Sequence, residues 1–175
     1  MLNAENVFLV GPMGSGKSAV GRQLAARLGL AFLDSDAEIE ARTGVDIAYI
    51  FEKEGEAGFR DREREVLDAL TGQSGVLVST GGGAVLDPDN RERLRSRGCV
   101  VYLRASVKQQ FARTRRSGHR PLLSNADPLG TLERLLQARA PLYEEVADLV
   151  VDTDGRKVSA VVEDVVRRLA EARGS

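Results

Sequence analysis

Residues 7–21, VFLVGPMGSGKSAVG, join a short apolar run to a loop that contains glycines, a lysine and a serine. The apolar run, residues 7–10, is typical of a strand that is buried on both faces. After the loop, apolar residues recur at helical spacing from Lys17 until Gly29, which predicts a helix that ends at a glycine. Residues 11–18 match Gly-x-x-x-x-Gly-Lys-[Ser/Thr], the P-loop pattern, between the strand and the helix that this motif requires. The stretch therefore predicts a site for a nucleoside triphosphate.

The alternation of strand and helix continues along the chain. Further strands are expected at the short apolar runs of residues 30–34, 75–80, 99–104 and 147–153. Helices are expected between them and after the last one, and two starts carry capping patterns, Asp87 before Pro88 and Ser106 three residues before Gln109. This order predicts a five-stranded parallel sheet with helices on both faces, a three-layer α/β/α fold. Because no linker or repeat interrupts the sequence, residues 1–175 are predicted to form a single domain.

Composition and charge narrow the classes of function. A chain of 175 residues with 42% hydrophobic residues is long enough to bury one substantial core. Its formal net charge of -1 gives no reason to expect a nucleic acid or an anionic membrane as a partner. The sequence shows no signal peptide and no apolar run long enough to span a bilayer, so we expect a cytoplasmic protein. The single cysteine, Cys99, is expected to be a buried thiol.

The P-loop residues are predicted to hold phosphate groups. Glycines allow backbone N–H groups to turn towards phosphate oxygens at a helix N-terminus, where the helix dipole favours anions. Lys17 would reach the β- and γ-phosphates, and the Ser18 hydroxyl would ligate Mg²⁺. The residues expected to contact ATP here are Gly14, Ser15, Gly16, Lys17, Ser18 and Ala19. The alternative is a glycine-rich connection that only turns tightly.

Two aspartates follow the second predicted strand. Asp34 and Asp36 are two residues apart, so in extended geometry both carboxylates would face the same side. One carboxylate would hold Mg²⁺, directly or through water, a role that we give to Asp34. The other, Asp36, would orient an acceptor hydroxyl and take its proton. The alternative is that Asp36 only caps the helix that follows it.

Arginines and glycines predict a second binding site. Arg60 lies beside a buried stripe of its helix, and Arg139 stands where a helix is expected to break before Pro141, so both guanidiniums could grip a carboxylate. The alternative for each is a surface arginine paired with a nearby glutamate. Gly81, Gly82 and Gly83 follow the third strand and would let a small ligand approach the backbone closely. A flexible turn is the alternative for them.

The segment of residues 113–128 is rich in arginine, serine, glycine and proline and lacks apolar periodicity. It is predicted to be a mobile lid. Arg120 in this lid would close over the phosphates and neutralise charge in the transition state. His119, the only histidine, is expected to face solvent rather than act as a base.

Taken in order, these motifs resemble the shikimate kinase family over nearly the whole chain. The resemblance rests on the P-loop, Asp34-Ser-Asp36, EAGFRDRE at residues 56–63, the three glycines, RPLL at residues 120–123 and RAPLY at residues 139–143. It implies the fold of nucleoside monophosphate kinases, with strand order 2-3-1-4-5, and a monomer. It also implies ATP-dependent phosphorylation of the 3-hydroxyl of shikimate, on the pathway to chorismate and the aromatic amino acids.

The resemblance implies a role for each matching residue. Asp36 would hold the reacting hydroxyl, while Lys17 and Arg120, with Mg²⁺, would steady the phosphates. The residues implied to bind shikimate are Arg60, Gly81, Gly82, Gly83 and Arg139, together with Asp36. Arg113 and Arg156 match positions that contact the nucleotide in the family, although the pattern around Arg156 is looser.

A P-loop is also compatible with three other functions. A nucleoside monophosphate kinase has a dianionic phosphate as its acceptor, and two carboxylates beside that acceptor would repel it. A kinase for another small hydroxy acid, such as gluconate kinase, is the second choice. A non-catalytic P-loop module that only binds a nucleotide would need no acceptor site, yet Asp36, Arg60 and Arg139 predict one.

Overall fold

The computed structural model describes residues 6–114 and 127–174. Arg120 and His119, with most of the predicted lid, lie outside the described residues. The two ends of the predicted lid belong to helices, because one helix ends at Thr114 and the next begins at Pro128. The single domain and the moving lid stay predictions.

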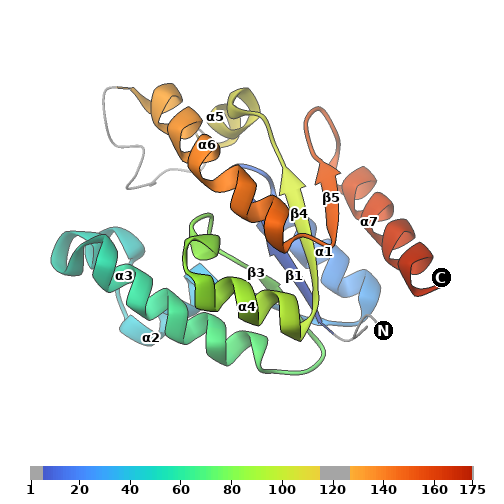
Figure 1. The fold of residues 1–175 in the computed structure, drawn as a ribbon, viewed down its shortest axis with the longest axis horizontal. Helices are drawn as coiled ribbons and strands as arrows, with labels where there is room; N and C mark the ends of the chain where they lie inside the picture. Colours follow the sequence, from blue (N-terminus) through green and yellow to red (C-terminus); the bar gives the residue numbers. More distant parts are fainter. Residues whose placement is uncertain (1–5, 115–126, 175) are drawn as a thin grey trace.

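The core of the molecule is a parallel sheet of five strands in the order β2-β3-β1-β4-β5, as expected (Figure 1). The strands are β1 (Val7–Val10), β2 (Ala31–Asp34), β3 (Val76–Ser79), β4 (Cys99–Arg104) and β5 (Leu149–Asp152). In the register of the central strand, Val7 pairs with Leu77 of β3 and with Cys99 of β4. The carboxyl ends of β1, β2 and β3 therefore open at the same edge of the sheet.

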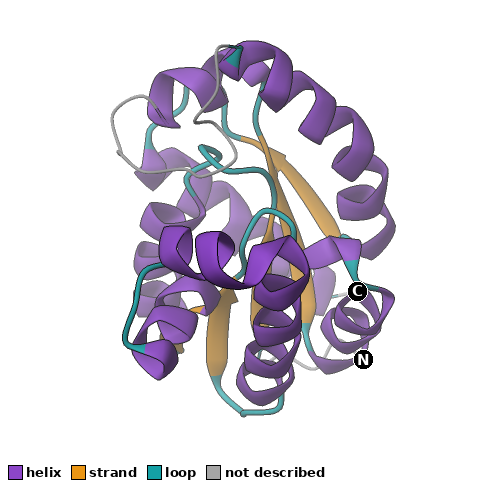
Figure 2. Cartoon of the chain, turned by 90° about the vertical axis from the view of Figure 1, so that its left-hand side faces the viewer, coloured by secondary structure: helices purple, strands orange, loops and turns teal. Residues whose placement is uncertain are grey.

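Helices cover both faces of this sheet, so that the strands lie in the middle layer (Figure 2). The helices are α1 (Lys17–Leu28), α2 (Ser35–Thr43), α3 (Ile47–Thr71), η1 (Ala84–Leu86), α4 (Pro88–Arg97), α5 (Val107–Thr114), α6 (Pro128–Val146) and α7 (Val158–Arg173). None of the helices in the described part of the chain is long and apolar enough to cross a membrane. Together the sheet and its two helical layers form the predicted three-layer α/β/α fold.

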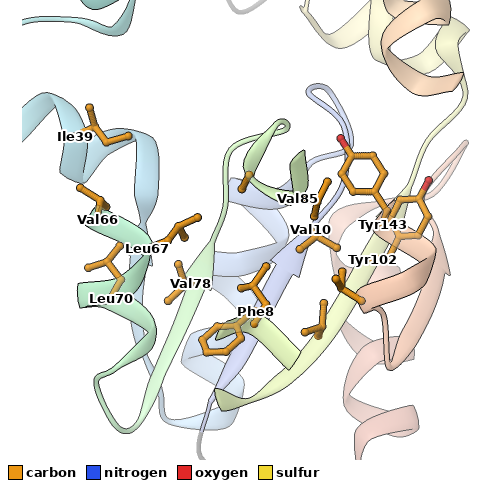
Figure 3. Close-up of a cluster of buried hydrophobic side chains, with 14 of the residues drawn as sticks. Phe8, Val10, Ile39, Val66, Leu67, Leu70, Val78, Val85, Tyr102 and Tyr143 are labelled. Atoms are coloured by element: carbon orange, nitrogen blue, oxygen red, sulfur yellow. The ribbon is translucent and has the colours of Figure 1, made fainter. Parts of the chain in front are cut away.

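The alternation of side chains along β1 divides the core in two. Phe8 and Val10 are fully buried and pack with side chains of α2, α3, α4 and α6 (Figure 3). Val7 and Leu9 point to the other face and pack with α1 and α7. Because both faces bury apolar side chains, the strand reads as a continuous apolar run in the sequence. The P-loop that follows β1 is thus anchored by the most buried strand.

The expected break before Pro141 is wrong, because α6 continues through this residue to Val146. A proline inside a helix costs one hydrogen bond and a clash, about 3 kcal/mol. Tertiary packing offsets this cost: Leu132, Arg139 and Tyr143 are buried on one face of α6. The Tyr143 ring also lies 5.0 Å from the Tyr102 ring of β4, measured between centroids.

The two predicted capping patterns have different outcomes. Asp87 caps α4 as expected, since its side chain accepts from the Asp89 N–H and Pro88 begins the helix. At α5 only half of the capping box forms, because the Gln109 N–H donates to Ser106 Oγ at 3.2 Å while the Gln109 side chain turns elsewhere. Its amide hydrogen-bonds the loop after β5, and the Ser106 N–H donates to Asp154 instead.

The helical segment before Thr71 is divided by two glycines. Gly44, in the left-handed conformation, ends α2, and Asp46 caps the start of α3. Inside α3, Gly55 adopts φ 72° and ψ 179°, a conformation that is essentially confined to glycine. The helix therefore consists of two segments that meet at Gly55.

Candidate active site

Two cavities open side by side beyond the carboxyl ends of β1, β2 and β3. The P-loop cavity, of about 380 Å³, is lined by the P-loop, Asp34 and Arg113. The arginine cavity, of about 230 Å³, is lined by Arg60, Arg139, Glu63 and apolar side chains of α3. The residues that line both are Met13, Asp36, Glu40, Gly81 and Gly82. A group bound in one cavity would therefore meet a group bound in the other across a common wall.

The P-loop has the conformation that its glycines permit. Gly14 and Gly16 have positive φ angles of 77° and 89°, and a Cβ on Gly14 would lie 2.8 Å from the Gln110 backbone of α5. The Lys17 ammonium donates to the carbonyls of Gly11 and Pro12 at 2.6 and 2.8 Å, so the loop carbonyls hold it over the loop. Of the residues expected to contact ATP here, all but the buried Ser15 line the P-loop cavity.

Ser18 and Asp34 lie together at this cavity. The Ser18 hydroxyl donates to Asp34 Oδ2 at 3.1 Å, and Asp34 Oδ1 accepts from the Ala37 N–H at 3.1 Å. Within the described residues, no group of three or more His, Cys, Asp or Glu side chains is placed to hold a metal ion by itself. A hydroxyl and a carboxylate are nevertheless the hard oxygen ligands that Mg²⁺ takes when phosphates complete its shell.

The geometric reason given for pairing Asp34 with Asp36 is wrong, although both line the P-loop cavity. The strand β2 ends at Asp34, and α2 begins at Ser35, so the two residues do not share an extended segment. Asp34 caps the helix, whereas Asp36, which was the suspected cap, lies in its first turn. A helical turn brings Asp36 to the wall between the cavities, and there it remains the candidate for the acceptor hydroxyl.

The arginine cavity brings together the predicted arginines and glycines. Arg60 donates to Glu63 at 3.0 Å and to Glu56 at 3.2 Å, and a Cβ on Gly83 would lie 2.6 Å from its guanidinium carbon. Arg139 reaches the same cavity from α6 and is 5% exposed. The Arg60 guanidinium therefore lies directly against the backbone of the glycine loop, and the predicted approach of a ligand to these glycines stays a prediction.

Tyr143 of α6 holds the glycine loop at positions 81–83 through a hydrogen bond. Its hydroxyl donates to the Gly82 carbonyl at 2.5 Å, and burial raises the pKa of this phenol. Sequence reasoning assigned no role to Tyr143, although it belongs to the RAPLY motif. The Gly82 carbonyl is thereby turned towards α6.

Glu63 is a further residue of the site that sequence reasoning missed. Its side chain is 1% exposed, and burial raises its pKa from 4.5 to about 7, with the neighbouring Asp36 adding to the shift while Arg60 opposes it. Its position three residues after Arg60 was the available signal, but such spacing is common in surface ion pairs. The structure instead places this carboxyl in the floor of the arginine cavity.

The predicted nucleotide arginines are separated in the structure. Arg113 lines the P-loop cavity, with Nη1 at 3.5 Å from the Gly14 carbonyl. Arg156 lines neither cavity and instead donates to Asp164 at 3.1 Å and to the Asp152 carbonyl at 3.0 Å. Its contact with a nucleotide therefore stays a prediction.

Both the sequence and the fold of this chain are similar to those of known proteins. The family model for shikimate kinase matches residues 13–170. The shikimate kinase of Halorhodospira halophila is 58% identical over 163 residues, covering 93% of this chain and 92% of that protein. A solved structure of the shikimate kinase from Acinetobacter baumannii in complex with shikimate is 47% identical, with a TM-score of 0.94, and covers 96% of this chain and 94% of that one.

A gluconokinase from Sinorhizobium meliloti is 21% identical with a TM-score of 0.59, covering 98% of this chain and 95% of that one. At this identity the likeness shows a common fold and no more. The family model, by contrast, spans both cavities, from Met13 of their common wall to α7. The chain belongs to the shikimate kinase family.

Proposed function

We propose that this protein transfers the γ-phosphoryl group of ATP to the 3-hydroxyl of shikimate, giving shikimate 3-phosphate and ADP. The observation that carries the proposal is the place of Asp36, in the wall shared by a P-loop cavity and a cavity lined by two arginines. A phosphate donor and a carboxylate-bearing acceptor would meet there.

The donor side is formed by the P-loop. Its backbone N–H groups and the N-terminus of α1 would hold the phosphates, and Lys17 would leave the loop carbonyls for the β- and γ-phosphate oxygens. Ser18 and Asp34 would hold Mg²⁺, which fits their adjacent oxygens. The ion would supply charge neutralisation on the phosphates. Arg113 would contribute a further positive charge beside the P-loop.

The acceptor side is formed by the arginine cavity. Arg60 and Arg139 would hold the carboxylate of shikimate, and the glycines at positions 81–83 would let the ring lie against the backbone. Apolar side chains of α3 that line the same cavity would cover the hydrocarbon part of the ring. Because Arg60 and Arg139 both line this cavity, we expect a hydroxy acid to be a better acceptor than a neutral polyol.

Asp36 would align the acceptor hydroxyl with the γ-phosphorus. The bond from the hydroxyl oxygen to phosphorus forms as the bond from phosphorus to the β-phosphate oxygen breaks, and the hydroxyl proton passes to the Asp36 carboxylate. Because such transition states are loose, alignment and charge neutralisation contribute more than the strength of the base.

The direct test is to measure ADP release from Mg-ATP with shikimate, with gluconate, with a panel of nucleoside monophosphates and with no acceptor. We expect strong release with shikimate only. Release with a nucleoside monophosphate would keep a kinase but remove the carboxylate-gripping role of Arg60 and Arg139, whereas release with gluconate would keep that role and change the acceptor. Tight ATP binding without acceptor-dependent release would favour the non-catalytic nucleotide-binding module.

A further inference from the structure

Glu63 and Asp36 bring two carboxyl groups to one small space. A Cβ on Gly81 would lie 2.8 Å from Asp36 Oδ1 and 3.0 Å from Glu63 Oε2, so both oxygens face the same point beside the glycine loop. Two carboxylates at such short range disfavour each other's charge. One of the two carboxyl groups is therefore expected to carry a proton during part of the working cycle.

Glu63 is the better holder of this proton because it is the more deeply buried of the two carboxyl groups, with a side chain that is 1% exposed. Only Oε1 is bonded to Arg60, at 3.0 Å, whereas Oε2 is buried without a hydrogen-bond partner among the described residues. A buried carboxylate oxygen that accepts no hydrogen bond is costly, and protonation removes that cost. Glu63 also lies in the middle of α3, far from the end of a helix dipole.

Asp36 lies in the first turn of α2, where the positive end of the helix dipole stabilises an anion. It also borders both cavities and is only half-buried. The two carboxyl groups therefore lie in different environments, and only the Glu63 side chain is fully buried.

Within residues 6–114 and 127–174, three charged groups face Glu63: Arg60 from its own helix, Asp36 from α2 and Arg139 from α6. The strand β3 and the glycine loop at positions 81–83 bring no titratable group to it. The two arginines are the groups that would bind the acceptor carboxylate. A bound acceptor carboxylate would compete with Glu63 for these two guanidinium groups. The ionised form of Glu63 would then be stabilised less than in the free protein.

We propose that Glu63 takes up one proton from solvent when the carboxylate of the acceptor binds to Arg60 and Arg139. The inference rests on the proposed function, since it needs an anionic acceptor in the arginine cavity. Its consequence is that acceptor binding weakens as the pH rises, because the bound state holds a proton that the free state has lost.

The test is calorimetric titration of the protein with shikimate alone, at pH 8, in two buffers of different ionisation enthalpy. The difference in apparent enthalpy gives the number of protons taken up. We expect about 0.9 proton at pH 8 and close to none at pH 5.5, because Glu63, with a pKa of about 7, is mostly ionised in the free protein at pH 8 and already protonated at pH 5.5. Binding with no proton uptake from pH 7 to pH 8.5 would overturn the inference.

Variants assign the proton to its residue. Glu63→Gln keeps an acceptor for Arg60 but cannot titrate, so we expect shikimate to bind without proton uptake. Glu56→Gln is the matched control, because Glu56 also pairs with Arg60 but its side chain is 54% exposed; it should leave the uptake unchanged. Uptake that persists in Glu63→Gln would overturn the assignment.

Two further controls concern the histidine and the folding of the Glu63→Gln variant. His119→Gln removes the only histidine and should preserve the uptake; uptake lost in this variant would move the proton to the histidine. If Glu63→Gln does not fold, which circular dichroism would show, the buffer dependence of the unaltered protein still decides the inference. Failure of shikimate to bind at all would contradict the proposed function, whereas binding without proton uptake contradicts this inference alone.

Discussion

At the scale of the residue, Asp36 lies where the two cavities meet. We expect Asp36→Asn to lower kcat at least about 100-fold, because the amide neither takes the proton nor holds the hydroxyl as a carboxylate does. The affinity for ATP should change less than about threefold, since the P-loop contacts are untouched. Steady-state kinetics together with nucleotide binding by fluorescence would measure both quantities.

Glu38→Gln is the matched control for this variant. Glu38 lies two residues further along α2, pairs with Arg42 at 3.0 Å and lines neither cavity, so turnover should be preserved. Full turnover in Asp36→Asn would remove Asp36 from the reaction. A loss of similar size in both variants would indicate damage to α2 rather than loss of a catalytic carboxylate.

The residues of the site were predictable to different degrees. Lys17 and Asp36 line the cavities because each lies in the first turn of a helix that follows a strand, and Arg60 lines the arginine cavity from within α3. Glu63 could not be predicted in the same way. Its spacing from Arg60 is that of any surface ion pair, and only the burial created by α2, α6 and the glycine loop makes it part of the site.

At the scale of the element, α5 joins the P-loop to the loop after β5. Gln109 donates to Thr153 and accepts from the Gly155 N–H at 3.0 Å, while Arg113 of the same helix lies over Gly14. We expect Gln109→Ala to raise KM for ATP several-fold and to leave KM for shikimate unchanged, because the variant loses hydrogen bonds of about 1 kcal/mol each that hold this loop.

Lys108→Ala is the control for α5, since Lys108 is the exposed neighbour of Gln109. Its Michaelis constants should stay at the values of the unaltered protein. Equal Michaelis constants in Gln109→Ala and the unaltered protein would show that the loop after β5 does not influence the nucleotide, and would also weaken the predicted role of Arg156.

Elements were predicted best where local signals decide and worst where tertiary contacts decide. The caps at Asp87 and at the N-terminus of α5 follow from short-range hydrogen bonds. The continuation of α6 through Pro141 depends on packing with β4 and the glycine loop, which no local pattern reports. The Gln109 side chain likewise hydrogen-bonds Thr153, which is 44 residues away, rather than a group at the start of its own helix.

At the scale of the whole molecule, buried charges should give stability a maximum at about pH 4 to 4.5, with a decline on either side. On the acid side, burial would raise the pKa of Asp164, but hydrogen bonds from Arg156 and Arg167 outweigh it and lower that pKa. The stability that this carboxylate contributes is present above its unfolded pKa and is lost as the pH falls through its folded value.

On the alkaline side the sign is reversed. The folded pKa of Glu63 is raised from 4.5 to about 7 by burial, so the associated stability is complete below pH 4.5 and is lost as the pH rises through 7. The loss amounts to about 3 kcal/mol. Thermal unfolding followed from pH 3 to pH 9 should show both limbs, and Glu63→Gln should flatten the alkaline limb only. An alkaline limb that is unchanged in this variant would contradict the assignment to Glu63.

The strand order of the molecule was predictable because it rests on many residues at once. Five apolar runs separated by helices predict a parallel sheet, and the family resemblance supplied the order, which the strand pairing confirms. The shape of the arginine cavity was not predictable. It depends on how α2, α3 and α6 lean over the sheet, and those directions follow from side-chain packing over the whole chain.

The break at Gly55 separates two segments of α3 that line different parts of the arginine cavity. Ile47, Ala48 and Phe51 line the arginine cavity from before the glycine, whereas Arg60 and Glu63 line it from after the glycine. Since no atoms crowd Gly55 within 4 Å, its constraint is conformational rather than steric. Substitutions in the first segment would reshape one side of the arginine cavity while leaving its charged side and the P-loop intact. Such an arrangement would let the two sides of the arginine cavity change independently of each other.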